Sequence, residues 1–288
     1  MPQSSWILLS LAGASFCLSA CTSTEEEEEE ELQSEASTHT LEQNIGGETV
    51  EREYTLHTPM NWDTSTELPL FFAFHGGGAQ GDYFVEEFNE TMQFTPFVGV
   101  YPQARDDGWS AAANGEDDVA FVLALLESLR ETPGVDSSSP VAYGYSNGAA
   151  FVHRLAIETD RFSGISAIAS QLVRSHQPTP GDPHVSVLQL HGTEDEVIEY
   201  EGSSESAEEG EDFLAAEESA AVWAAHNGCS AIPTETPTGA YTRMEWPECS
   251  TGTRVVHYRL NGEGHDVPWE VEDDTFATVV NFLMGTRP

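Results

Sequence analysis

The sequence predicts an α/β fold in which a mostly parallel sheet carries helices on both faces. From residue 50 onward, apolar stretches that fit buried strands alternate with stretches of helical periodicity. The run LPLFFAF at 68–74 holds no charged residue, which is typical of a parallel strand with both faces covered. In open sheets of this kind ligands bind beyond the carboxyl ends of the strands. The residues that follow each strand are therefore the first candidates for chemistry.

The expected elements follow two patterns. Short apolar or alternating runs predict strands at 50–58, 68–74, 97–101, 141–145, 165–169, 185–190 and 254–260. Apolar residues that recur every three or four positions predict helices at 117–130, 149–158, 212–226 and 274–284. The segment 230–248 is rich in proline and is expected to hold little secondary structure.

Three segments of different composition divide the chain. Residues 1–20 contain the apolar stretch WILLSLAGASFCLSA and are expected to be an export signal, although the usual basic start is missing. Residues 21–45 include the acidic run 25–31 and are expected to be a disordered tether. Residues 46–288 are expected to form a single folded domain.

The end of the signal resembles a bacterial lipobox. The sequence LSAC at 18–21 would place Cys21 at the new N-terminus, where its thiol would be acylated. The expected location is thus outside the cytoplasm, either secreted or anchored to the bacterial cell envelope as a lipoprotein. An ordinary secretory signal with an incidental Cys21 is the alternative. Membrane contact is expected only through a lipidated Cys21.

The composition is strongly acidic. Fifty Asp and Glu residues against ten basic residues, all of them Arg, give a formal charge of -40. Such a surface repels nucleic acid and anionic membranes, so neither is an expected partner. A lysine-free acidic composition is also typical of adaptation to high salt. A surface that only keeps the protein soluble is the alternative.

The cysteines predict one disulfide. Cys17 and Cys21 belong to the signal region, which leaves Cys229 and Cys249 in the domain. An even pair in an exported domain predicts a bond between them, and two buried free thiols are the alternative.

A serine motif lies where the fold is expected to carry chemistry. Residues 144–148 (GYSNG) fit the pattern G-x-S-x-G between an expected strand and an expected helix. That context is typical of a nucleophile elbow, so Ser146 is the predicted nucleophile. The pattern alone arises by chance in about one of ten chains of this length. The position of the motif between an expected strand and an expected helix supports a catalytic role over a chance match.

A glycine-rich loop follows the expected strand at 68–74. In HGGG at 75–78 small residues would let backbone N–H groups approach a substrate carbonyl. The expected oxyanion donors are Gly77 or Gly76, together with Asn147, which follows the nucleophile. A simple glycine turn is the alternative.

An acid and a histidine follow the last two expected parallel strands. Asp195 in HGTED at 191–195 is the predicted acid, with Glu194 and Glu196 as adjacent competitors. His265 lies before the last expected helix, and its predicted role is the general base. No His and Cys cluster has zinc-ligand spacing and no phosphate-binding loop is present, so no metal or cofactor is expected.

Together these motifs resemble the polyhydroxybutyrate depolymerase and feruloyl esterase family, which consists of single-domain secreted α/β-hydrolases. The resemblance runs from about residue 50 to the C-terminus, and its motifs are HGGG at 75–78, GYSNGA at 144–149, HGTEDEV at 191–197 and GEGHDVPW at 262–269. It implies an α/β-hydrolase fold and hydrolysis of carboxylic esters through an acyl-enzyme on Ser146, without a cofactor. It also implies a supporting role for 117–121 and the pairing of Cys229 with Cys249.

One departure from the family concerns the acyl pocket. Val267-Pro268-Trp269 stands where the family usually has Trp-Pro, which leaves His265 in place. The pocket walls are expected from the loops 79–95, 106–116 and 198–212. Soluble or oligomeric esters are the favoured substrates, and a monomer is expected. The alternatives on the same fold are a serine peptidase of the prolyl oligopeptidase type, an acyltransferase and a non-catalytic surface-binding module.

Overall fold

The computed structural model describes residues 34–105, 108–112, 118–203, 212–267 and 270–287. The predicted export signal, Cys21 and the acidic run 25–31 lie outside these residues, as do Asp117, Pro268 and Trp269. No helix within the described ranges is long and apolar enough to cross a membrane.

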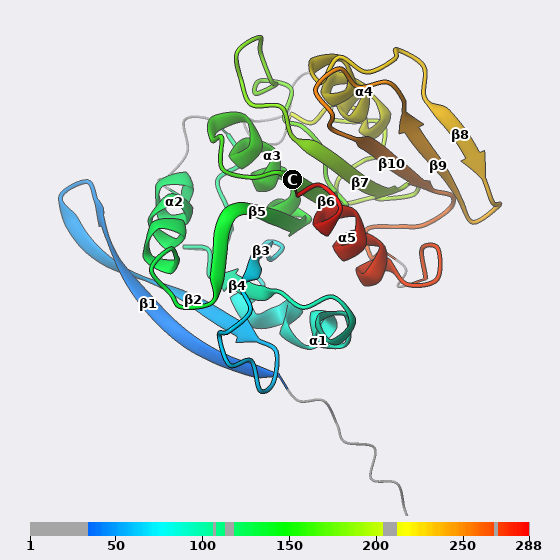
Figure 1. Ribbon diagram of the computed structural model, residues 1–288. Helices are drawn as coiled ribbons and strands as arrows, with labels where there is room; N and C mark the ends of the chain where they lie inside the picture. The colour runs from blue at the N-terminus through cyan, green and yellow to red at the C-terminus, as the bar shows by residue number, and fades with distance from the viewer. Residues whose placement is uncertain (1–33, 106–107, 113–117, 204–211, 268–269, 288) are drawn as a thin grey trace, which may run out of the picture. The chain divides into compact units, whose positions relative to one another are not determined.

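The described strands form one sheet in the order β1-β2-β4-β3-β5-β6-β7-β10-β9-β8 (Figure 1). The strands are β1 Glu35–Ile45, β2 Glu48–Thr58, β3 Leu68–Phe74, β4 Val98–Pro102, β5 Val135–Tyr145, β6 Gly164–Ile168, β7 Ser186–Gly192, β8 Thr234–Pro237, β9 Tyr241–Trp246 and β10 Val255–Leu260. The central strands from β4 to β10 are parallel, and antiparallel pairs extend the sheet at both ends. The predicted mostly parallel sheet is therefore confirmed.

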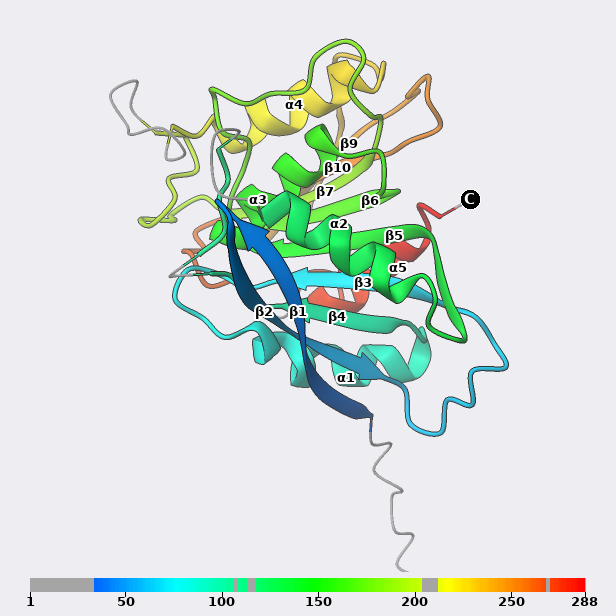
Figure 2. The ribbon, with the colours of Figure 1, turned by 90° about the vertical axis from the view of Figure 1, so that its left-hand side faces the viewer.

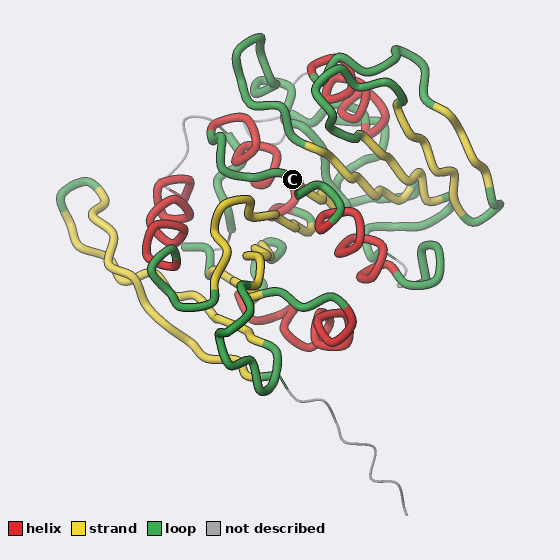
Figure 3. Tube along the Cα trace, viewed as in Figure 1, coloured by secondary structure: helices red, strands yellow, loops and turns green. Residues whose placement is uncertain are grey.

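Helices cover both faces of the sheet (Figures 2 and 3). One face carries α2 Asp118–Leu129, α3 Asn147–Glu158 and α4 Ala216–His226, and the other carries α1 Val85–Phe94 and α5 Thr275–Met284, with the short 3-10 helix η1 Gly81–Phe84 before α1. In β3, Phe72 and Phe74 pack in the core of the first face, whereas Phe71 and Ala73 pack in the core of the second. Burial on both faces explains why this strand is apolar at every position.

The folded domain begins earlier in the chain than predicted. Residues 35–45, expected to belong to the disordered tether, form β1 and pair with β2 over its whole length, so the boundary at residue 45 was wrong. Gly46 and Gly47 have φ of 61° and 94°, which suits a tight two-residue hairpin turn. The side chains of β1 are mostly exposed, so the strand lacks the apolar alternation that reveals strands in a sequence.

The proline-rich segment 230–248 is also more ordered than predicted. It forms the hairpin of β8 and β9 at the edge of the sheet, so the expectation of little secondary structure was wrong. In β9, Thr242, Met244 and Trp246 are buried and alternate with partly exposed residues. The structure joins Cys229 and Cys249 in the predicted disulfide, which ties the end of α4 to the loop after this hairpin.

Candidate active site

Ser146 lies in a tight turn between β5 and α3. Its backbone has φ 54° and ψ -121°, a conformation that non-glycine residues rarely adopt. A Cβ added to Gly144 would lie 2.2 Å from the carbonyl oxygen of Gly148, and one added to Gly148 would lie 2.2 Å from that of Phe74. The two glycines of the motif are thus required by close backbone approach, and the strand–turn–helix context has the form expected of a nucleophile elbow.

The three predicted catalytic residues form one hydrogen-bonded chain. His265 Nε2 lies 2.9 Å from Ser146 Oγ, and His265 Nδ1 lies 2.8 Å from Asp195 Oδ2. Because a carboxylate only accepts, Nδ1 donates to Asp195, which leaves Nε2 free to accept from the serine hydroxyl. Ser146 follows β5, Asp195 follows β7 and His265 follows β10, so all three lie beyond the carboxyl ends of parallel strands.

Asp195 is held as a carboxylate. Its burial raises the pKa, but hydrogen bonds from His191, His265 and the N–H groups of Ile198 and Val197 outweigh burial and hold the pKa well below its usual range. The two N–H groups lie 2.9 and 2.8 Å from Oδ1. An ionised acid in this position would stabilise a positively charged imidazolium at His265.

The neighbouring acids differ from Asp195 in their surroundings. Glu194 and Glu196 are exposed, whereas the side chain of Asp195 is fully buried against His265. The geometry therefore favours Asp195 among the three. His191, the first residue of the HGTED motif, lies in β7; it is also fully buried, and its Nε2 lies 3.1 Å from Asp195 Oδ2.

The glycine loop after β3 lies against Ser146. A Cβ added to Gly76 would lie 3.3 Å from the Cβ of Ser146, so any larger residue would crowd the serine. His75 holds the loop, because its Nδ1 donates to the Gly76 carbonyl over 2.8 Å and its Nε2 accepts from the N–H of Ala104 over 3.0 Å. Gly76 and Gly77 line the cleft together with Asn147.

Asn147 begins α3, so its N–H group has no acceptor within the helix. Its side chain bonds both the N–H and the carbonyl of Trp109. The next residue, Ser110, donates its N–H over 3.0 Å to Asp118, which forms a buried ion pair of 2.8 Å with Arg52. Asp118 thus supports the loop that holds Asn147, as the resemblance implied for this stretch.

The cleft above Ser146 has a volume of about 930 Å³. Aromatic and aliphatic side chains line much of it, and Tyr83 and Val197 are 52% and 69% exposed at its surface. The lining residues besides those already described are Ala79, Tyr83, Tyr145, Glu196, Val197, Ile198, Glu199, Ser203 and Phe213. The expected walls at 79–95 and 198–212 do contribute, whereas the described residues of 106–116 do not line the cleft.

Residues 196 and 197 also line the cleft, although they lie outside the predicted walls. The signal that would have indicated a cleft wall here is the apolar pair Val197 and Ile198, two and three residues after Asp195 in the otherwise acidic stretch HGTEDEVIEY at 191–200. Tyr145 also lines the cleft, and its hydroxyl donates over 3.1 Å to the carbonyl of His265. Burial and the nearby Asp266 raise the pKa of Tyr145, so this hydroxyl stays protonated.

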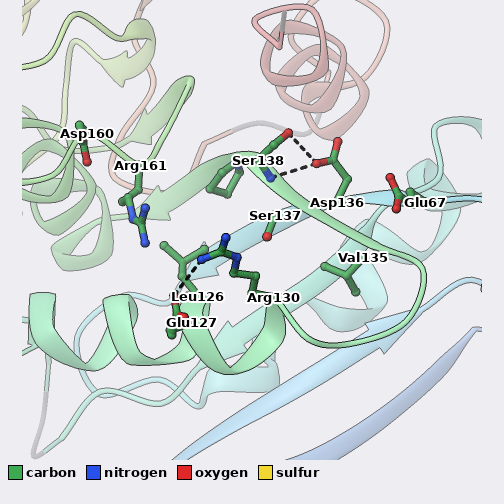
Figure 4. A pocket seen from close by; sticks show the side chains of 11 residues that line it. Glu67, Leu126, Glu127, Arg130, Val135, Asp136, Ser137, Ser138, Asp160 and Arg161 are labelled. Carbon is green, nitrogen blue, oxygen red and sulfur yellow. Dashed lines mark hydrogen bonds and ion pairs between the residues drawn. The ribbon is translucent and has the colours of Figure 1, made fainter.

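A second pocket, of about 470 Å³, lies at the amino end of β5, away from these strand ends (Figure 4). Arg130 and Arg161 reach into it together with Asp136 and Ser138, and Arg130 lies 3.8 Å from Glu127. It contains no serine paired with a histidine, so it is not the candidate catalytic site. Within the described parts of the chain, no group of three or more His, Cys, Asp or Glu residues is placed to hold a metal ion.

Comparison with known proteins identifies relatives in sequence. The chain is 27% identical over 230 residues to a probable feruloyl esterase C of Aspergillus niger. The matched region covers 75% of this chain and 76% of that protein. The predicted resemblance to feruloyl esterases is confirmed. The names of such relatives agree with the enzyme class that the sequence predicts, an esterase. No protein-family model matches the chain.

Solved structures show the same fold. An acetyl xylan esterase from Aspergillus awamori has a TM-score of 0.60 at 14% identity and covers 85% of this chain and 99% of its own. A poly(3-hydroxybutyrate) depolymerase from Bordetella parapertussis has a TM-score of 0.52 at 18% identity, covering 82% and 85%. The predicted α/β-hydrolase fold is therefore confirmed.

Proposed function

We propose that this protein is a serine carboxylic-ester hydrolase that acts through an acyl-enzyme on Ser146. The observation that carries the proposal is the chain of hydrogen bonds from Ser146 through His265 to Asp195. Ser146 and His265 line the cleft, where a substrate can reach them. The sequence relatives named as feruloyl esterases support it independently. No metal or cofactor is needed for this chemistry.

The first half of the reaction acylates the serine. Ser146 Oγ attacks the ester carbonyl while His265 Nε2 takes the hydroxyl proton, and Asp195 stabilises the resulting imidazolium. The backbone N–H groups of Asn147 and of Gly77 or Gly76 stabilise the negative charge on the carbonyl oxygen. The ester C–O bond then breaks, and His265 delivers its proton to the leaving alcohol.

The second half releases the acid. Water attacks the acyl carbon, His265 accepts its proton, and the same N–H groups stabilise the second tetrahedral intermediate. Collapse of that intermediate breaks the bond to Ser146 Oγ, which regains its proton from His265.

The cleft favours neutral esters with an apolar or aromatic acyl group. Tyr83, Tyr145 and Phe213 offer apolar and aromatic surface, which suits a planar acyl group. Glu196 and Glu199 are exposed at the cleft, and no Arg is among its described lining residues. A substrate with its own carboxylate would be repelled there. We therefore propose feruloyl-type and similar neutral esters, soluble or oligomeric, as substrates.

The location outside the cytoplasm is part of the proposal. A disulfide between Cys229 and Cys249 suits an oxidising compartment. Lipidation of Cys21 and the monomeric state stay predictions.

A substrate screen tests the function. The purified domain is assayed against methyl ferulate, acetylated xylan, hydroxybutyrate oligomers, short nitrophenyl esters and aminoacyl arylamides, with added alcohols in a parallel series. We expect hydrolysis of neutral esters, with free acid as the main product. Preferred cleavage of the arylamides would indicate a peptidase, ester products with added alcohols an acyltransferase, and no turnover of any substrate a binding module.

A further inference from the structure

A buried histidine lies directly behind the acid of the proposed triad. We propose that His191 is a positioning residue, which holds Asp195 and the turn 195–198 in the arrangement that His265 requires. This inference rests on the proposed function.

The contacts of His191 determine which of its nitrogens carries the proton. His191 Nε2 lies 2.8 Å from the carbonyl oxygen of Ile198 and 3.1 Å from Asp195 Oδ2. A carbonyl oxygen and an ionised carboxylate are both acceptors only, so Nε2 carries a proton and shares it between them. His191 is therefore a donor to the catalytic acid.

Two imidazole rings approach the same oxygen of Asp195. His265, which lines the cleft, donates to Oδ2 from Nδ1, and the fully buried His191 donates to Oδ2 from the interior. The other oxygen, Oδ1, accepts the N–H groups of Val197 and Ile198. The four donors fix the carboxylate on every side, and only His265 among them takes part in proton transfer.

Ile198 closes this arrangement into a ring of hydrogen bonds. Its N–H donates to Asp195, and its carbonyl accepts from His191, which in turn donates to Asp195. Loss of the imidazole would therefore release both the carboxylate and the turn that carries it. Val197 and Ile198 also line the cleft, so the same ring of hydrogen bonds connects Asp195 to the wall of the cleft.

The orientation of the His191 ring is itself fixed. The ring of Tyr200 packs edge-on against it, with centroids 5.6 Å apart and an interplanar angle of 88°. The Tyr200 hydroxyl is held in turn by Glu217 at 3.0 Å and His257 at 2.9 Å. A half-turn of the His191 ring would put carbon where Nε2 now lies and would break both of its bonds.

The remaining nitrogen of His191 shows that this position is not optimised for packing alone. Within the described residues, Nδ1 is buried and has no hydrogen-bond partner. An unpaired buried polar atom destabilises a fold, and an apolar side chain of similar size would avoid that cost. The imidazole is therefore explained by the bonds that Nε2 makes.

The test compares His191→Leu with His191→Gln in the full domain. Leucine removes the donor, whereas the amide N–H of glutamine reaches about as far as Nε2. Because a hydrogen bond to a charged group contributes strongly, we expect kcat of the leucine variant to fall about tenfold or more, with KM changed less than about threefold. Glutamine should restore kcat to within about threefold of wild type. Active-site titration with a fluorophosphonate corrects each kcat for the fraction of folded sites.

A spectroscopic readout separates positioning from general stability. The downfield proton resonance of His265 Nδ1–H reports on its bond to Asp195, and it should move in the leucine variant and return in the glutamine variant. His153→Asn is the matched control, because it removes a buried imidazole that bonds Trp223 and does not contact Asp195, and it should keep wild-type kcat.

A normal corrected kcat and an unmoved resonance in His191→Leu would overturn the proposal, as would a tenfold loss of corrected kcat in His153→Asn. If wild-type protein hydrolyses no ester, or if hydrolysis does not depend on Ser146, the proposed function fails instead. The two failures are thus distinguishable.

Discussion

His265 Nδ1 donates a 2.8 Å hydrogen bond to Asp195 Oδ2, although the two residues are separated by 70 positions in the chain. The bond leaves the other ring nitrogen facing Ser146 Oγ. The arrangement depends on Asp195 having no proton or N–H of its own to offer the ring, and this dependence can be tested by a single substitution.

Asp195→Asn should lower kcat about a thousandfold or more without unfolding the domain. An amide in this position can donate to His265 Nδ1, which would favour the tautomer that cannot accept the proton of Ser146. The measurement is kcat for a nitrophenyl ester, with circular dichroism as the check on folding. Glu194→Gln and Glu196→Gln are matched controls, and a comparable loss in either would move the role of the acid to that residue.

Buried histidines should make the domain less stable as the pH falls from 7 to 5. Burial lowers the pKa of His57 to about 4 and those of His153 and His257 to about 3. Below the unfolded pKa of about 6.5, the unfolded chain binds protons that the folded chain does not, so stability is lost on acidification. At pH 5 each histidine should lower the free energy of unfolding by about 2 kcal/mol relative to pH 7.

His153→Asn tests this pH dependence directly. Asparagine keeps an acceptor for the N–H of Trp223, which donates to His153 Nδ1 over 3.0 Å, but it does not titrate. In urea unfolding at pH 7 and pH 5, the variant should lose less stability than wild type between the two values. Equal losses in the two proteins would show that His153 does not contribute to the pH dependence.

Salt should stabilise the domain. With a formal charge of -40, carboxylates repel one another over about 10 Å at 0.1 M salt, and added ions screen that repulsion. Thermal melts are expected to show a rising Tm from 0.1 to 2 M NaCl. A Tm that stays constant or falls would indicate that the acidic surface only confers solubility.

The carboxylates at the cleft should discriminate against anionic substrates. Replacing both Glu196 and Glu199 with Gln should raise kcat/KM for an ester with a free carboxylate by about threefold at low salt, because exposed charges interact weakly. The value for the matching neutral methyl ester should change little. Glu235→Gln, on the edge strand β8, is the control for a general change in net charge. Equal gains for both esters would contradict the assignment.

The sequence was sufficient to predict a structural element where burial leaves a pattern of apolar residues. The central strand 68–74 was predicted with its observed bounds, because burial on both faces demands an unbroken apolar run. The order of Ser146, Asp195 and His265 was predictable because each follows a parallel strand, and such strands end at the same edge of the sheet.

Two of the features that were missed, β1 and the bonds of His191, leave no such pattern in the sequence. β1 is an exposed edge strand, and its ladder with β2 depends on the turn at Gly46 and Gly47 rather than on apolar side chains. The role proposed for His191 depends on bonds to Asp195 and Ile198 that form only when the turn folds back on β7. The residue types in a turn do not show which of their atoms will form hydrogen bonds.

The most direct test of the proposed function is the reaction of Ser146→Ala with a nitrophenyl ester and a fluorophosphonate probe. Ser128→Ala, on α2, is the matched control for loss of a serine hydroxyl away from the cleft. We expect Ser146→Ala to lower turnover at least about a thousandfold and to abolish labelling, while the control behaves as wild type. Retention of most of the activity in Ser146→Ala would contradict the account, because the nucleophile would then lie elsewhere.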